Sequence, residues 1–292
     1  MQIEDALDRF LVQLEADGRS AHTIGQYRRH VRLLANWLVQ EGRSRDVIRI
    51  DHEDLACFLA SPTARNRPDG KKKKATAMNA LRTSLRCFFG YLHRAGVIRE
   101  DPARLVRRAI CAPPPPRALT EGEETKLLKV LREAQGVEAR RDRVLFELML
   151  ATGIRLSSAL GLDIEDADLD EGVLLLRRVK GDRTERVFIN RKAQGLLRDH
   201  MDGLETGPVF LGRGGERLSN RHCQRKFRAW REKAGISRAI TCHGLRHTYA
   251  MRLYAKTGDI ALVQRALGHR SITSTLVYAH ADEARLKVAV GA

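Results

Sequence analysis

The sequence predicts a mainly α-helical protein of two domains, the second of which contains a small antiparallel β-sheet. The observations behind this are the length of 292 residues, helical spacing of apolar residues along most of the chain, and four consecutive prolines at 113–116. A chain of this length exceeds the usual size of one domain. Four prolines cannot continue a helix and favour an extended spacer. We therefore expect an N-terminal helical domain at 1–111, a proline-rich linker at 112–118 and a second domain at 119–292.

Four main helices are expected in the N-terminal domain, because apolar residues recur there at intervals of three and four. The first helix places Ile3, Leu7 and Leu14 on one face. The second is expected to begin at Thr23, which together with Gln26 has the spacing of a capping box. Further helices share this spacing and are expected at 51–62, at 78–96 and, as a short one, from Pro102.

Helices surround one predicted hairpin in the second domain. Thr120 and Glu123 form a capping box that opens a helix, and an apolar helix at 141–153 ends at Gly153. The stretches 172–179 and 184–190 read as strands, and the turn sequence Lys-Gly-Asp-Arg between them predicts a β-hairpin. Helices are then expected at about 191–202, 219–235 and 243–256, with shorter ones to about 277.

The net charge of +17 indicates a polyanionic partner. Residues 1–111 contain 21 Lys and Arg against 13 Asp and Glu, and the remainder contains 32 against 23. Because both halves carry the excess, we expect both to contact a long polyanion, with nucleic acid the first candidate. A turn-rich loop is predicted at 61–74, and it ends in four lysines at 71–74. These lysines either contact DNA phosphates or lie in a solvated loop. Phosphate contacts would add affinity without recognising a DNA sequence.

Other classes of protein are disfavoured by composition. The chain has no apolar run of about 18 residues, as a membrane-spanning helix needs, and its N-terminus lacks a signal-peptide pattern. The five cysteines are scattered singly, which argues against a disulfide framework or a zinc ribbon. We therefore expect a cytoplasmic protein with reduced thiols.

Two histidines and an arginine lie close together on the helix predicted at 243–256. Arg246 follows His243 by three residues and His247 follows it by four, so the three share one helical face. A His pair at this spacing occurs in zinc proteases, but Gly244 stands where their glutamate is required and no third ligand is evident. Arg presents a planar fork to phosphate oxygens, and His exchanges protons near neutral pH. The cluster therefore favours an anion over zinc.

Five short motifs follow one another along the second domain. They are Thr-Gly-x-Arg ending at Arg155, Lys180 with a glycine after it in the hairpin turn, His-x-Leu-Arg-His from His243, Leu-Gly-His ending at His269, and Tyr278. In order and spacing they resemble the tyrosine recombinase family, which includes phage integrases and Xer-type recombinases. The resemblance covers nearly the whole chain, because the family combines an N-terminal helical core-binding domain, a linker and a C-terminal catalytic domain.

The resemblance implies a site-specific DNA recombinase. Tyr278 would attack a DNA phosphodiester, giving a 3′-phosphotyrosyl link that retains the energy needed for rejoining. Arg155 and Arg246 would clamp the phosphate oxygens. Lys180 would protonate the leaving 5′ oxygen, and His243 would act as an acid–base group.

His269 and His247 complete the residues that the resemblance implies. His269 would hydrogen-bond the phosphate and help to hold the site, and His247 would have a supporting structural role. No metal or other cofactor is implied, because two arginines supply the positive charge. The chain departs from many family members at Ser158, where they have an acid three residues after the first arginine. This puts the fine tuning of the site in doubt rather than the reaction class.

The implied partners are double-stranded DNA with inverted half-sites and further recombinase subunits. We expect a homo-tetramer, or a hetero-tetramer with a related recombinase, on two DNA sites at the nucleoid. The tail after Tyr278 fits either a helix that docks on a neighbouring protomer or a frayed terminus. The sequence does not identify the target DNA, accessory factors, or a chromosomal, phage, transposon or integron-type origin.

Two other functions are compatible with parts of this pattern. A recombinase-like protein that only binds and shapes DNA would bind tightly without cleaving. A type IB topoisomerase would use similar chemistry on one duplex and relax plasmids that lack any special site. The full set of Arg, Lys, His and Tyr residues argues against the first alternative, and the two-domain plan together with His269 argues against the second.

Overall fold

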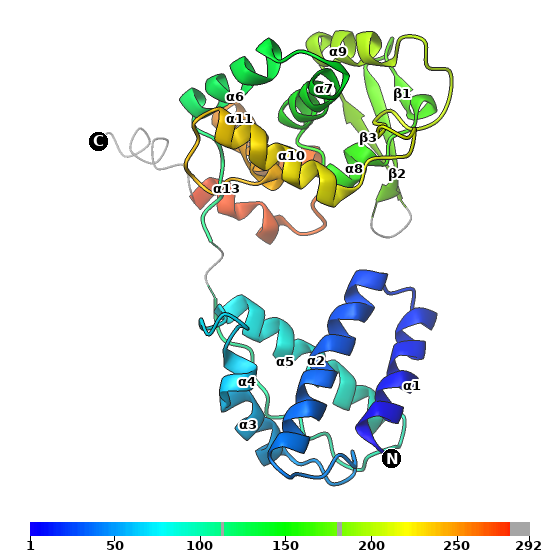
Figure 1. Cartoon of the computed structure of the whole chain (residues 1–292), viewed down its shortest axis with the longest axis vertical. Coiled ribbons are helices and arrows are strands. Elements are labelled where there is room, and N and C mark those ends of the chain that lie inside the picture. Colours follow the sequence, from blue (N-terminus) through cyan, green and yellow to red (C-terminus); the bar gives the residue numbers. More distant parts are fainter. Residues whose placement is uncertain (112–113, 180–182, 281–292) are drawn as a thin grey trace, which may run out of the picture. The chain divides into compact units, whose positions relative to one another are not determined.

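The computed structural model of the chain describes residues 1–111, 114–179 and 183–280. The chain divides into two compact units, Met1–Ala112 and Pro113–Ala292. Both units are mainly helical, and the second contains a small antiparallel sheet (Figure 1). This confirms the predicted fold class. Within the described ranges, no helix is long and apolar enough to cross a membrane.

The first unit is built around three long helices (Figure 1). Its helices are α1 (Ile3–Ala16), α2 (Ala21–Gln40), α3 (His52–Ala60), α4 (Pro62–Arg65) and α5 (Ala75–Arg94). The long helices α1, α2 and α5 pack against one another. The apolar positions at helical spacing line the core between them, where Ile3, Leu34 and Phe88 are fully buried.

The start of α2 differs from the predicted capping box. Ser20 precedes the helix, and its hydroxyl accepts a hydrogen bond from the backbone N–H of Thr23. Thr23 itself lies in the first turn of the helix, so the capping box predicted from Thr23 and Gln26 is wrong. Ser and Thr are both good capping residues, and the one that precedes the first helical turn satisfies its free N–H groups.

Two shorter predictions in this unit also need correction. Part of the loop predicted at 61–74 is the helical turn α4, which Ser61 caps by accepting a hydrogen bond from the N–H of Ala64. The short helix expected from Pro102 is instead a series of turns over 102–105. Asp101 accepts a hydrogen bond from the N–H of Ala103 there, which stabilises a local turn.

The chain segments on both sides of the proline run are fixed to their own units. In the first unit, the buried amide of Asn79 donates to the carbonyl of Ala109 and accepts from its N–H, both at 2.8 Å. In the second unit, the N–H of Leu119 donates to the hydroxyl of buried Thr248 at 2.8 Å. These side chains therefore define where the segment between the units begins and ends.

Helices of the second unit surround the apolar helix α7 (Val137–Thr152). The other helices described in this unit are α6 (Glu121–Glu133), α8 (Leu156–Leu160), α9 (Arg191–Met201), α10 (Asn220–Lys233), α11 (Cys242–Thr257), α12 (Ile260–Leu267) and α13 (Leu276–His280), with 3₁₀ turns η1 (Ile164–Asp166) and η2 (Ile272–Ser274). Helix α7 packs against α6, α9 and α11. The predicted capping box of Thr120 and Glu123 opens α6, and Gly153 ends α7 in the left-handed conformation, both as expected.

The sheet consists of β1 (Ala167–Asp168), β2 (Val173–Val179) and β3 (Arg183–Phe188), all antiparallel. It lies on the side of the unit away from α6 and α11 (Figure 1). The hairpin of β2 and β3 was predicted, whereas β1 was not, because two residues are too few to show a periodic pattern. The inner face of β2 carries Leu174 and Leu176, which are buried in the core of the unit.

Candidate active site

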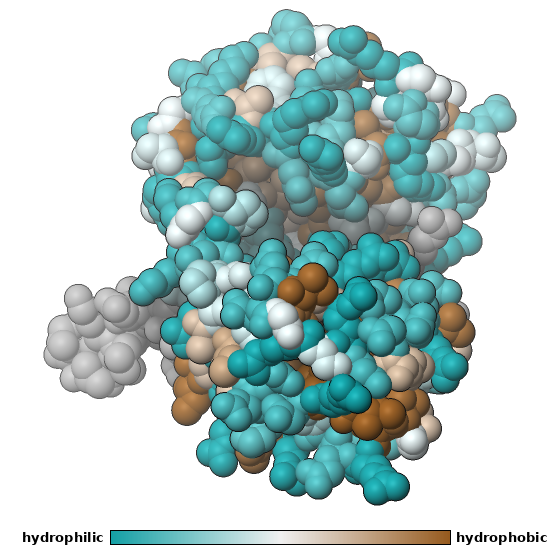
Figure 2. All heavy atoms as spheres, turned by 60° about the horizontal axis from the view of Figure 1, so that its bottom comes forward, coloured by the Kyte–Doolittle hydropathy of each residue, from teal (hydrophilic) through white to brown (hydrophobic). Residues whose placement is uncertain are grey.

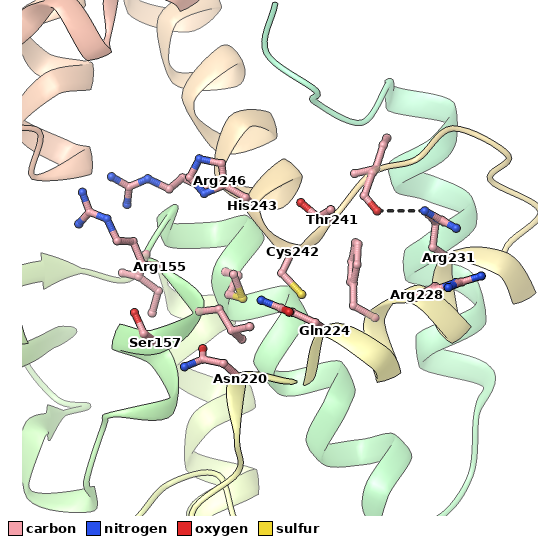
Figure 3. Close-up of a pocket in the computed structure, with 15 residues that line it drawn as sticks. Arg155, Ser157, Asn220, Gln224, Arg228, Arg231, Thr241, Cys242, His243 and Arg246 are labelled. Carbon is pink, nitrogen blue, oxygen red and sulfur yellow. Dashed lines mark hydrogen bonds between the residues drawn. The ribbon is translucent and has the colours of Figure 1, made fainter. Parts of the chain in front are cut away.

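A cavity of about 500 Å³ in the second unit brings together three of the predicted site residues. Arg155, His243 and Arg246 line it, together with the polar side chains of Asn220 and Gln224 from α10. In Figure 3 the guanidinium groups of Arg155 and Arg246 lie at one end of the cavity, with His243 next to Arg246. The residues come from the start of α8 and from the first turns of α11, which explains how distant motifs reach one place.

Arg246 is the most tightly held of these side chains. It is buried, and its two terminal nitrogens donate to the carbonyls of Gly153 at 2.7 Å and Leu267 at 2.5 Å. Its buried Nε has no partner among the described residues. Burial and the nearby charge of Arg155 lower its pKa to about 10, so it remains a cation at neutral pH. The guanidinium is therefore a fixed positive charge with a donor still available.

Gly153 explains why the Thr-Gly-x-Arg motif holds Arg155 beside Arg246. It ends α7 with φ of +67°, and a Cβ at this position would come within 2.3 Å of the Tyr249 ring. Only glycine fits both the backbone conformation and the close approach. Arg155 follows as the residue that precedes α8. Its side chain makes no hydrogen bond or ion pair within the described residues, so it is free to bind a ligand.

His243 and His247 lie one turn apart on α11 with their rings edge to face, 4.6 Å between centroids. Although part of the His243 ring is exposed, desolvation lowers its pKa, and the charges of Arg246 and Arg155 add to this. Burial, together with His243 and Arg246, lowers the pKa of His247 to about 4. Both rings are therefore neutral near pH 7, and each can accept a proton or a hydrogen bond.

Tyr278 is almost completely buried, with 1% of its surface exposed. Its hydroxyl lies 3.1 Å from Nδ1 of His247. The ring packs in a small apolar cluster with Ala250, Val263 and Leu267. Burial raises the pKa of the hydroxyl, and the charge of Arg246 opposes this rise. The hydroxyl is thus connected to the His243–His247 pair but is covered from solvent.

His269 lies just beyond Gly268, which ends α12 in the left-handed conformation. Its Nδ1 is 2.9 Å from the hydroxyl of buried Thr275. Burial and the charges of Arg246 and Arg155 lower the pKa of His269 to about 4. The imidazole is therefore held in one orientation close to the arginine pair.

The structure brings together five of the six predicted residues and does not describe the sixth. Lys180 lies outside the described residues. Ser158 lies against β2 beside Leu175 and Arg177. Glu185 was not predicted as a site residue, but its carboxylate is close enough to Arg246 to raise the pKa of that guanidinium. In the predicted hairpin, Glu185 pairs with Leu176, and this pairing could have indicated that the Glu185 side chain points toward the core. The residue that its carboxylate contacts, Gly268, is distant in the sequence and could not be predicted.

Anion binding is the chemistry that these residues suit best. Among the described residues, no group of three or more His, Cys, Asp or Glu side chains lies close enough together to hold a metal ion. Two neighbouring guanidinium groups and neutral imidazoles provide positive charge, hydrogen-bond donors and proton acceptors. This combination can bind a phosphate group and stabilise further negative charge on it.

Comparison with solved structures identifies the class of protein. The fold matches that of the XerH site-specific recombinase in a pre-cleavage complex with difH substrate, with a TM-score of 0.72 and 25% identity over 91% of this chain and 78% of that chain. It also matches lambda integrase in a tetramer bound to a Holliday junction, with a TM-score of 0.71 and 22% identity over 94% and 79% of the two chains. The fold is that of the recombinases that cleave and rejoin DNA strands.

Comparison with protein families and curated relatives is more specific. Residues 117–285 match the phage integrase family, and residues 7–96 match the phage integrase N-terminal SAM-like domain. The tyrosine recombinase XerC of Pseudomonas aeruginosa is 34% identical over 94% of this chain and 90% of its own length. The chain therefore belongs to the phage integrase family of tyrosine recombinases and is a site-specific DNA recombinase.

Proposed function

We propose that Tyr278 is the nucleophile with which this recombinase cleaves DNA. The observation that carries the proposal is the contact of its hydroxyl with His247, one helical turn from His243 and next to Arg246. A tyrosine hydroxyl within hydrogen-bond distance of a neutral imidazole, with a second imidazole beside it and a fixed guanidinium nearby, has a route for its proton and a charge that favours the phenolate.

The reaction would proceed as two phosphoryl transfers. The Tyr278 oxygen attacks the phosphorus, the bond to the 5′ oxygen breaks, and a 3′-phosphotyrosyl link forms. The phenolic proton passes to a base, for which we propose His243, and the leaving 5′ oxygen takes a proton from Lys180. The reverse sequence, with a 5′ hydroxyl as the nucleophile, rejoins the strand and restores the free tyrosine.

Arg155 and Arg246 would bind the non-bridging oxygens of the phosphate. Arg246 is already fixed by two carbonyls, so it would supply charge without further reorganisation. Arg155 has no hydrogen-bond or ion-pair partner within the described residues and would add a second planar fork. His269, oriented by Thr275, would donate a hydrogen bond to the same group.

The buried position of Tyr278 implies a change of conformation before cleavage. Tyr278 lies in α13, described at Leu276–His280, and must leave the apolar cluster to reach a phosphate. We propose that binding of DNA and assembly with further subunits release it. The lambda integrase tetramer on a Holliday junction supports a tetramer here, and either identical or related subunits could complete it.

The first unit would also bind the DNA, as a core-binding domain. Its excess of basic residues and the match to the integrase N-terminal domain support this role. We propose that the whole chain binds double-stranded DNA with inverted half-sites and acts in the cytoplasm at the nucleoid.

A nicked DNA substrate that traps the covalent intermediate tests the nucleophile. The nick lets a short fragment diffuse away after cleavage, so the wild type should accumulate protein joined to DNA. Tyr278→Phe should abolish this product, because only the hydroxyl is removed. Tyr249→Phe is the matched control, since it removes a hydroxyl from a partly buried ring that packs against the same cluster, and it should react like the wild type.

The same assay separates the alternative functions. Equal trapping by Tyr278→Phe and the wild type would show that another residue is the nucleophile. Tight, salt-sensitive DNA binding with no cleavage by the wild type would favour a purely architectural role. Relaxation of plasmids that lack any target site, without exchange between sites, would favour a topoisomerase.

A further inference from the structure

Glu185 on β3 is a carboxylate that faces the interior of the second unit. It lies directly opposite Leu176 of β2, and opposed residues of an antiparallel pair point to the same face of the sheet. Leu176 is buried in the core, and Glu185 is half-buried. Within the described residues, the carboxylate makes no hydrogen bond and no ion pair. A half-buried charge on the core side of a sheet requires a favourable electrostatic environment.

The carboxylate of Glu185 lies against Gly268, at the end of α12. A Cβ added to Gly268 would be 2.5 Å from Oε2 and 2.7 Å from Oε1 of Glu185. These distances are well below ordinary van der Waals contact, so the absence of a side chain at Gly268 makes room for the carboxylate. Glycine at this position therefore has two roles: it adopts the left-handed conformation that ends α12, with φ of +58°, and it leaves space for the Glu185 carboxylate.

This position places Glu185 against the residue that follows the carbonyl acceptor of Arg246. The Nη2 of Arg246 donates to the carbonyl of Leu267, the residue before Gly268. The negative charge of Glu185 favours the cationic form of Arg246, whereas burial and Arg155 oppose it. Two guanidinium groups repel each other when no phosphate lies between them, and a nearby carboxylate reduces that repulsion.

We propose that Glu185 is a positioning residue for the recombination reaction: its carboxylate, seated on Gly268, is a fixed counter-charge that holds the Arg155–Arg246 pair ready to receive the DNA phosphate. Ser158 carries no charge and lies against β2, so it does not provide this counter-charge. The inference rests on the proposed function, because it assumes that the arginine pair binds the scissile phosphate. It assigns Glu185 no contact with DNA.

The proposal makes DNA binding and cleavage respond differently to loss of the charge. A carboxylate close to the phosphate site repels the phosphate, so its removal should leave DNA binding unchanged or slightly stronger. The arginine pair would then be less well fixed, and the cleavage step should slow. A purely structural role of Glu185 would instead weaken binding and cleavage together.

Glu185→Gln tests this with shape retained and charge removed. In single-turnover reactions on the nicked substrate, we expect cleavage to slow about tenfold or more, with the Kd for intact DNA within about threefold of the wild type. The fall in cleavage rate at alkaline pH should move to lower pH, because Glu185 raises the pKa of Arg246. Glu171→Gln is the matched control, an equal charge change at an exposed turn before β2, and should cleave like the wild type.

Gly268→Ala separately tests the contact between the Glu185 carboxylate and Gly268. The change is made in the wild type and in a Glu185→Ala background. In the wild-type background the added Cβ meets the carboxylate, and cleavage should slow as in Glu185→Gln. In a Glu185→Ala background the Cβ has room, so the same change should have little further effect. Because the left-handed conformation at Gly268 strains alanine equally in both backgrounds, the comparison isolates the contact.

Specific results would overturn the proposal. Cleavage by Glu185→Gln at the wild-type rate, equal losses of binding and cleavage, an unshifted alkaline limb, or additive effects in the Gly268 comparison would each do so. Failure of the wild type to form a covalent complex, or trapping that survives Tyr278→Phe, would instead overturn the proposed function on which the inference depends.

Discussion

The contact between Tyr278 and His247 controls whether the tyrosine hydroxyl is available. Because burial, together with His243 and Arg246, lowers the pKa of His247 to about 4, its ring is neutral at pH 7 and Nδ1 can accept a hydrogen bond from the hydroxyl. A buried hydroxyl without a partner costs about 1–3 kcal/mol. The hydrogen bond therefore stabilises the covered position of Tyr278, which agrees with a structural role for His247.

His247→Leu should loosen α13 without removing the tyrosine. Leucine cannot accept the hydroxyl hydrogen bond, so the covered position should lose about 1–3 kcal/mol. We expect faster hydrogen exchange of the backbone amides at 276–280. His247→Gln retains an acceptor and should show a smaller change. Exchange rates equal to the wild type in both variants would show that apolar packing alone holds Tyr278.

Among the secondary-structure elements, α7 is joined to its neighbours by Glu147. The buried carboxylate of Glu147 receives Arg132 of α6 and Arg143 of α7 at 3.1 Å, and Lys192 of α9 at 3.0 Å. Burial raises its pKa, but the three hydrogen bonds outweigh this and leave the pKa below its usual value. The ionised carboxylate thus joins three helices, α6, α7 and α9.

Glu147→Gln should lower the free energy of unfolding by about 1–3 kcal/mol at pH 7, because partly exposed cations lose a shared partner. A group with a lowered pKa stabilises the fold above its unfolded pKa of about 4.5. The difference between variant and wild type should therefore shrink as pH falls below that value. Glu133→Gln, which removes an exposed ion pair with Lys129, should change stability by less than about 0.5 kcal/mol. A difference that persists at acid pH would contradict this account.

Long helices were predictable from the sequence because their buried faces repeat along the chain. The capping box at Thr120 and the glycine stop at Gly153 are also local signals, and both were correct. The start of α2 was wrong, since Ser20 and Thr23 are equally suitable caps when judged from sequence alone. The two-residue strand β1 depends on pairing with β2 and has no local pattern of its own.

The residues proposed for the site could be named from the sequence, but their arrangement could not. Motif order identified Arg155, Arg246 and Tyr278, but no local pattern shows that Tyr278 is buried. The contact of Glu185 with Gly268 joins a strand to a helix end far along the chain. Such contacts arise from tertiary packing, which periodicity and motif spacing do not describe.

The charge of the whole molecule should determine how its DNA binding depends on salt. The face shown in Figure 2 is mainly hydrophilic, with separate hydrophobic patches. Positive charge is in excess in both halves of the chain, so phosphate contacts are expected from each. The lysines at 71–74 contribute four of these charges within one short stretch.

The structure separates these four lysines into two kinds. Lys71, Lys72 and Lys74 are exposed, whereas Lys73 is partly buried and donates to the carbonyl of Ala64 at 2.7 Å. Burial also lowers the pKa of Lys73. Only the three exposed lysines are therefore free to contact a DNA backbone.

Replacing Lys71, Lys72 and Lys74 together by glutamine should weaken binding to DNA of any sequence. The slope of log K against log salt concentration should fall by about one for each lysine that contacts a phosphate. Lys73→Gln is the control, because it makes the same substitution at the lysine that is partly buried. It should leave the slope unchanged. It should instead lower the stability of the first unit, because the carbonyl of Ala64 loses the lysine donor. If the triple replacement leaves the slope unchanged, the loop is solvated in the complex and the salt dependence comes from other basic residues. If Lys73→Gln reduces the slope as well, the lysine leaves Ala64 when DNA binds.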